Sequence, residues 1–129
     1  LQIPSILRLL PPGRTVGIVL SQPSTLAPQL RALGLPPDLP MAALAEDSAM
    51  LRDLRAGRSP IAPEIHRRDL LAAAEWLLLR HPEVGALVLE CANFPPHSRA
   101  LSAAFGLPVF DMVSMVNWLH AALYPDSFL

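Results

Sequence analysis

Short apolar runs alternate with amphipathic stretches along the chain. The runs at Thr15–Leu20, Ala86–Cys91 and Pro108–Val113 are too short for a typical helix and are bounded by Gly, Pro or charged residues. This pattern predicts strands buried on both faces. Met41–Ala45 is rich in Ala, which favours helix, but it lies where a βαβ unit needs a strand, so we interpret it as a weak second strand.

Helical periodicity fills the intervals between these strands. Asp47 is the predicted N-cap of one of the helices. The alternation predicts a single flavodoxin-like α/β domain, with a four-stranded parallel sheet in the order 2-1-3-4 and helices on both faces. The predicted helices are Ile3–Leu10, Leu26–Leu33, Met50–Ala56, Pro63–His81, Pro96–Phe105 and Met115–Leu123. Trp76 and Trp118 are expected to be packing residues.

The composition narrows the class of protein. A length of 129 residues fits one domain, and a net charge of −1 argues against nucleic acid or an anionic membrane as a partner. No apolar run is long enough to span a membrane, and no signal peptide is recognisable. The single cysteine cannot form an internal disulfide, which favours a reducing, cytoplasmic location.

The two ends of the chain lie in apolar sequence. The chain begins at Leu1, within an apolar pattern and without an initiator Met, and it ends with Phe128 and Leu129. We therefore expect a piece of a longer protein. The face toward the missing part would be apolar, which predicts self-association.

Several common chemistries lack their motifs. No Gly-x-Gly-x-x-Gly follows a predicted strand, and a phosphate loop ending in Gly-Lys-Ser/Thr is impossible because all ten basic residues are arginine. The four histidines are scattered and one cysteine gives no metal-ligand spacing, so we predict no metal. We predict no other cofactor either.

Cys91 stands out because it ends a buried strand directly before a helix start. In open α/β sheets, ligands bind beyond the carboxyl ends of the strands. A thiol there can act as a thiolate, because a helix N-terminus stabilises negative charge.

The residues around Cys91 resemble a known motif. Leu89–Pro96 (Leu-Glu-Cys-Ala-Asn-Phe-Pro-Pro) resembles the second cysteine motif of the aspartate/glutamate racemase superfamily, whose better-known form is Cys-Thr-Asn or Cys-Thr-His followed by a hydrophobic residue and proline. Gly106–Val113 and Val116–Leu119 resemble the next strand and helix of that family. The resemblance implies that residues 1–129 are one α/β domain, the C-terminal half of a two-domain racemase-like protein.

The same resemblance implies an isomerase that needs no cofactor. One thiol removes the proton α to a carboxylate and a second thiol, from the other half, returns a proton on the opposite face. Cys91 would be one of these acid/base thiols, and Ala92, Asn93 and Ser21 would bind the small carboxylate substrate. Family members often carry Thr at the position of Ala92. Since the partner half is missing here, this chain alone is expected to be inactive.

Two alternatives stay open beside the racemase. One is a decarboxylase-like enzyme that uses a single cysteine. The other is a non-catalytic α/β domain that binds a small acid or a protein. The further candidate residues are Glu90, His97, Asp111 and Glu46, for which structural roles compete with functional ones, and His97 in particular is expected to be a solvated surface histidine.

Overall fold

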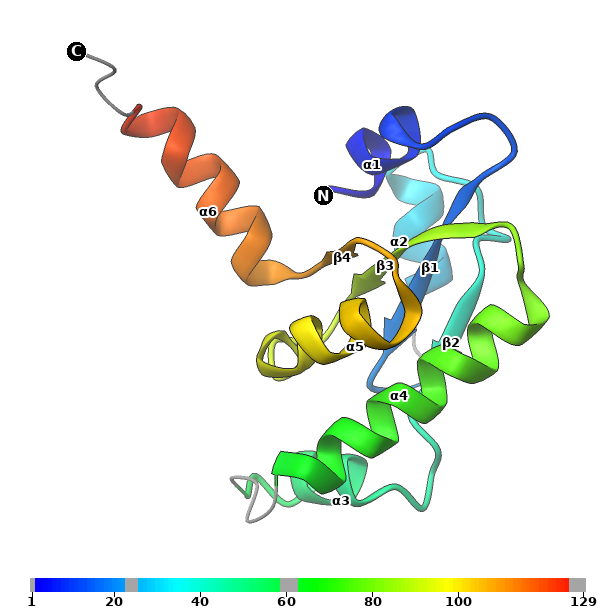
Figure 1. The fold of residues 1–129 in the computed structure, drawn as a ribbon, viewed down its shortest axis with the longest axis vertical. Coiled ribbons are helices and arrows are strands. Elements are labelled where there is room, and N and C mark those ends of the chain that lie inside the picture. Colours follow the sequence, from blue (N-terminus) through cyan, green and yellow to red (C-terminus); the bar gives the residue numbers. More distant parts are fainter. Residues whose placement is uncertain (1, 23–25, 59–62, 126–129) are drawn as a thin grey trace.

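The structure is a computed structural model that describes residues 2–22, 26–58 and 63–125. Helices and strands alternate along the chain, as Figure 1 shows. In chain order they are α1 (Ile3–Leu9), β1 (Thr15–Leu20), α2 (Leu26–Ala32), β2 (Met41–Ala43), α3 (Ala49–Arg55), α4 (Pro63–Arg80), β3 (Val84–Leu89), the 3-10 turn η1 (Pro95–His97), α5 (Ser98–Phe105), β4 (Val109–Phe110) and α6 (Met112–Leu123).

The four strands form one parallel sheet in the order β2-β1-β3-β4. The register pairs Ile18 of β1 with Met41 of β2 on one side and with Val88 of β3 on the other. The predicted α/β class and the predicted strand order are therefore confirmed. The weak strand at Met41 is also present, and its pairing with β1 explains why Ala residues are extended there.

Two apolar cores lie on opposite faces of the sheet, because alternate residues of a strand point to opposite sides. Val19 and Leu89 point into the core that contains Leu70 and Leu77 of α4. Ile18, Val88 and their neighbours point into the other core, which includes Ile3 and Ile6 of α1. Helices therefore cover both faces, as the alternating pattern predicted.

Two helix starts differ from the sequence prediction. Ser48, rather than Asp47, is the N-cap of α3, and its hydroxyl accepts a hydrogen bond from the Leu51 N–H. The predicted fourth strand is wrong beyond Phe110, because Asp111 is the N-cap of α6 and accepts a hydrogen bond from the Ser114 N–H. A capping side chain thus ends the strand and starts α6 three residues earlier than predicted.

Helix α6 projects away from the body of the molecule (Figure 1). None of its residues is buried. The prediction that both tryptophans are packing residues is wrong for Trp118, which is 62% exposed, and for Trp76 of α4, which is 48% exposed with the Arg80 guanidinium 4.1 Å from its ring. None of the helices in the described ranges is both long and apolar enough to cross a membrane.

Candidate functional site

Cys91 lies at the carboxyl edge of the sheet, two residues after the end of the central strand β3. The Glu90 N–H still donates to the Val19 carbonyl at 3.0 Å, so the chain remains attached to the sheet up to the residue before the thiol. The Cys91 side chain is partly buried against the core that contains Phe94 and Leu101. The thiol therefore stands at the edge where ligand sites of parallel α/β sheets occur.

A tight turn anchored by one aromatic side chain follows Cys91. The Phe94 N–H donates to the Cys91 carbonyl at 3.0 Å, and the His97 N–H donates to the Phe94 carbonyl at 2.9 Å. Phe94 is fully buried and fixes the turn to the core. The turn leaves Ala92 and Asn93 exposed beside the thiol.

Asn93 places a donor next to the sulfur. Its side-chain nitrogen lies 3.8 Å from the Cys91 Sγ, within reach of an N–H···S hydrogen bond. In the described part of the chain, neither the Ala92 N–H nor the Asn93 N–H donates to a backbone carbonyl. The backbone N–H groups of Ala92 and Asn93 and the Asn93 amide are therefore donors in exposed residues next to the thiol in the sequence, and donors of this kind suit a small anionic group.

Glu46 and Asp111, two other candidate residues, form contacts that stabilise the fold. Glu46 is exposed and forms an ion pair with Arg55, with 2.9 Å between its Oε2 and the arginine Nη1. Asp111 is buried, where it accepts hydrogen bonds from the Ser98 hydroxyl and the Ser114 N–H. Within the described residues, neither side chain forms a hydrogen bond or an ion pair with Cys91, and both hold helices in place.

His97 does not have the surroundings that the sequence suggested. The expectation of a solvated surface histidine is wrong, because the side chain is only 5% exposed. Burial, with the positive charges of His66 and Arg67 nearby, lowers the pKa of His97 below its ordinary value. The neutral imidazole is therefore the favoured form at this place.

A small hollow of about 260 Å³ lies on the opposite face from the Cys91 side chain. Glu90 and Ala92 line it, together with Gln2 of the α1 N-terminus and Met112 of α6. Ser21, at the carboxyl end of β1, is half-buried and does not line it. The candidate residues at the sheet edge thus divide between two faces, with the thiol on one and Glu90 on the other.

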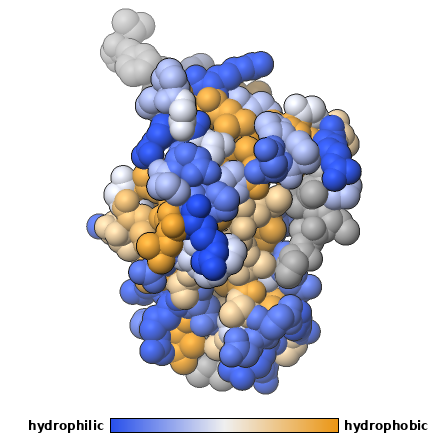
Figure 2. Space-filling model, turned by 90° about the vertical axis from the view of Figure 1, so that its right-hand side faces the viewer, coloured by the Kyte–Doolittle hydropathy of each residue, from blue (hydrophilic) through white to orange (hydrophobic). Residues whose placement is uncertain are grey.

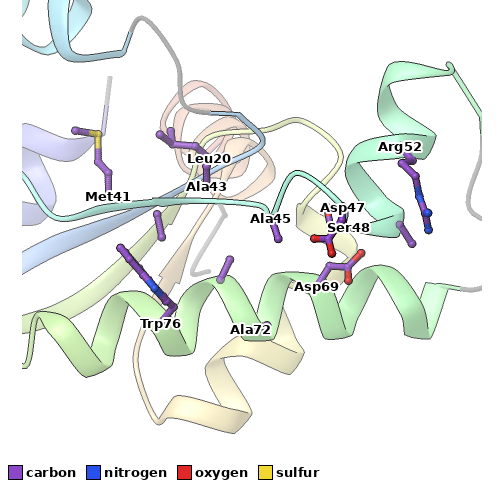
Figure 3. Close-up of a pocket in the computed structure, with 13 residues that line it drawn as sticks. Leu20, Met41, Ala43, Ala45, Asp47, Ser48, Arg52, Asp69, Ala72 and Trp76 are labelled. Atoms are coloured by element: carbon purple, nitrogen blue, oxygen red, sulfur yellow. The ribbon is translucent and has the colours of Figure 1, made fainter.

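A larger groove of about 1000 Å³ lies beside the edge strand β2, between α3 and α4 (Figure 3). Asp47, Ser48 and Asp69 gather at one end, and Trp76 lies at the other. On the molecular face in Figure 2, hydrophobic and hydrophilic residues are interspersed, and both kinds lie near the middle. Cys91 does not line this groove.

The sequence analysis did not predict this groove, because many of the residues that line it are alanines from separate elements. An alanine side chain has no functional group that would suggest a binding site. Its acidic end has a structural task, since the Asp69 Oδ2 accepts the Met50 N–H at 2.8 Å and so caps α3.

A pair formed by the buried His66 and the partly exposed Asp53 was also missed by the sequence analysis. The His66 Nε2 lies 2.8 Å from the Asp53 Oδ2, and the Arg58 Nη2 lies 3.2 Å from the Asp53 Oδ1. The hydrogen bond from His66, with help from Arg58, holds the pKa of Asp53 below its usual value. The spacing of 13 residues between Asp53 and His66 gives no motif, so only the packing of α3 on α4 reveals the pair.

Comparison with known proteins finds local similarity to three lyases. The chain is 38% identical to dimethylsulfoniopropionate lyase 5 of Emiliania huxleyi over 53 residues, which are 41% of this chain and 10% of that protein. It is 33% identical to dimethylsulfoniopropionate lyase of Durusdinium sp. clade D over 58 residues, 45% of this chain and 19% of that protein. It is 36% identical to dimethylsulfoniopropionate lyase 7 of Emiliania huxleyi over 63 residues, 49% of this chain and 18% of that protein.

The matched segments cover between 10% and 19% of the length of these lyases. No protein-family model matches the chain. No solved structure matches it either.

These findings correct the functional expectation from the sequence. The similar proteins are named lyases, so the resemblance to aspartate/glutamate racemases and the isomerase that it implied are wrong. The decarboxylase alternative is not supported by these names either. What stands after the correction is a flavodoxin-like α/β fold with local similarity to proteins named dimethylsulfoniopropionate lyase.

Proposed function

We propose that this chain carries the acid/base thiol of a lyase that cleaves dimethylsulfoniopropionate or a closely related sulfonium carboxylate. The observation that carries the proposal is the similarity to three lyases of that name, at 33% to 38% identity. The position of Cys91 at the carboxyl edge of the sheet supports it, because an acid/base group must be reachable by a small substrate.

The chemistry needs one base. In the proposed reaction, the Cys91 thiolate takes a proton from the carbon next to the substrate carboxylate. The electrons of that C–H bond form the new carbon–carbon double bond, and the bond between the β-carbon and sulfur breaks with its electron pair moving to sulfur. The products are acrylate and neutral dimethyl sulfide, and the Cys91 thiol then releases its proton to water.

A single thiol is sufficient for this elimination. A racemase must return a proton to the opposite face of the carbon, which requires a second group placed there. An elimination does not return a proton to that carbon, and its sulfonium leaving group departs as an uncharged molecule. The Cys91 thiol alone could therefore serve as the acid/base group of this elimination.

The residues around the thiol have matching tasks in this proposal. The Asn93 amide and the backbone N–H groups of Ala92 and Asn93 hold the substrate carboxylate, where they also stabilise the negative charge that develops as the proton leaves. Ser21 at the neighbouring strand end would donate a further hydrogen bond. We also propose that the protein is located in the cytoplasm.

The direct test is release of dimethyl sulfide from dimethylsulfoniopropionate, measured in the headspace by gas chromatography. The protein should release dimethyl sulfide and acrylate in equal amounts, and Cys91→Ser should lower the rate by at least about a hundredfold, in the range of lost acid/base catalysis. Ala103→Ser, on the exposed side of α5, is the matched control and should retain the activity.

Two outcomes would contradict different parts of the proposal. Absence of dimethyl sulfide release by the unmodified protein would reject the lyase activity. Full activity of Cys91→Ser, with the fold verified by circular dichroism, would keep the activity but remove Cys91 from the mechanism.

A further inference from the structure

We propose that α6 is the contact surface of a homodimer, in which each copy covers the projecting helix of the other. This inference does not depend on the lyase chemistry. It starts from the exposure of apolar side chains on α6 and its C-cap, which range from 45% to 75% exposed. They are Met112, Val113, Val116, Trp118, Leu119, Leu123 and Tyr124.

The apolar side chains form a wide face on α6, and its polar residues Ser114, Asn117 and His120 follow each other at a spacing of three. Met112, Val116, Leu119 and Leu123 follow each other at spacings of four, three and four residues, the spacing by which one helix packs on another. Trp118 lies outside that row and is 62% exposed. A helix with so wide an apolar face is normally covered by a partner, and this face is wider than a single helix seam would use.

The direction in which α6 leaves the body is held by hydrogen bonds. The Asp111 side chain accepts from the Ser98 hydroxyl of α5 and from the Ser114 N–H of α6, and the Asp111 carbonyl accepts the Gln2 side-chain amide at 3.0 Å. The first turn of α6 is therefore fixed to α5 and to the start of α1. The exposed surface of α6 therefore has a fixed position relative to α5 and α1.

Charge and area identify the occupant as a second copy. Helix α6 contains no Asp, Glu, Lys or Arg, so it offers no complement to a charged partner and no repulsion to another α6. Each partner of a standard-sized interface buries on the order of 800 Å², and seven large apolar side chains with this exposure supply an area of that order. The apolar hollow at the root of α6, lined by Ile3, Val88 and Met115, continues this surface onto the body.

Sedimentation equilibrium across a wide range of protein concentrations tests the proposal. We expect a monomer–dimer equilibrium for the unmodified protein. Leu119→Glu should raise the dissociation constant of the dimer by more than about tenfold, because it places a charge in the apolar contact. Leu79→Glu is the matched control: Leu79 is 77% exposed on α4, outside the proposed contact, and this variant should dimerise normally.

A milder variant separates loss of the contact from loss of the fold. Val116→Thr keeps the shape of the side chain and adds a hydroxyl, and it should weaken the dimer while the circular dichroism spectrum stays unchanged. A monomer at every concentration, or a dimer equally stable in Leu119→Glu and the unmodified protein, would overturn the proposal. The former result would mean that α6 is covered in some other way.

Discussion

The side-chain nitrogen of Asn93 lies 3.8 Å from the sulfur of Cys91, two residues earlier in the same turn. The buried ring of Phe94 fixes this turn to the core, so the contact belongs to the fold rather than to a free loop. An amide donor at this distance stabilises negative charge on the sulfur more than on the neutral thiol.

Replacing Asn93 by Ala should slow the reactions of the Cys91 thiolate. Loss of the amide donor should reduce the rate of alkylation by iodoacetamide, at neutral pH and in the folded protein, by about three- to tenfold, which is the range of an ordinary hydrogen bond. Asn93→Gln keeps the amide on a longer side chain and should recover part of the rate. Equal alkylation rates in Asn93→Ala and the unmodified protein would show that the contact does not act on the sulfur.

The buried His97 should make the protein less stable in mild acid. Because the folded-state pKa of His97 lies below the ordinary value of 6.5, the unfolded chain binds the proton more readily. The stabilising contribution is fully present above about pH 6.5 and is lost as the pH falls from there through the folded-state pKa. Urea unfolding between pH 5 and 8 should show this loss in the free energy of unfolding.

The matching variants distinguish His97 from the other titrating groups. His97→Gln should flatten the pH dependence in that window, whereas His120→Gln, at an exposed position on α6, should leave it unchanged. A pH dependence that is the same in His97→Gln and the unmodified protein would assign the acid sensitivity to other groups.

Gly17 is required by the close approach of α4 to β1. A Cβ at this position would lie 2.8 Å from the Leu77 Cδ2 and 3.0 Å from the Val84 Cγ1. Gly17→Ala should therefore lower the free energy of unfolding by about 1–3 kcal/mol through overpacking. Gly85→Ala is the comparison, since its Cβ would meet Arg14 and Leu10 side-chain atoms at 3.2 Å, and it should cost less in the same urea titration.

Asp111→Ala should destabilise the start of α6. The substitution removes the cap of the Ser114 N–H and the acceptor of the Ser98 hydroxyl, so we expect a loss of about 0.5–2 kcal/mol together with reduced helical signal in circular dichroism. Ser114→Ala removes only the reciprocal part of the capping box and should have a smaller effect. An unchanged unfolding curve for Asp111→Ala would mean that the capping contacts add nothing to stability.

Part of the candidate site could be located from the sequence. The run that ends at Cys91 is apolar on both sides of the strand, so it had to be a central strand, and its end had to lie at the edge of the sheet where ligands bind. The chemistry could not be read in the same way. A cysteine after a strand is compatible with several reactions, and the similarity to lyases corrected the isomerase that the local motif suggested.

The positions of the strands and of most helices follow from the sequence itself, because hydrophobic periodicity and Gly or Pro boundaries are local properties of the chain. The order of the strands follows from their alternation with helices and from the right-handed connection of parallel strands. Contacts between distant residues do not follow from it. The pairing of His66 with Asp53, the burial of His97 and the fixing of α6 by Asp111 each depend on which helices pack together. Tertiary structure decided these features, since burial and hydrogen bonding across elements are set by distances in space and not by spacing along the chain.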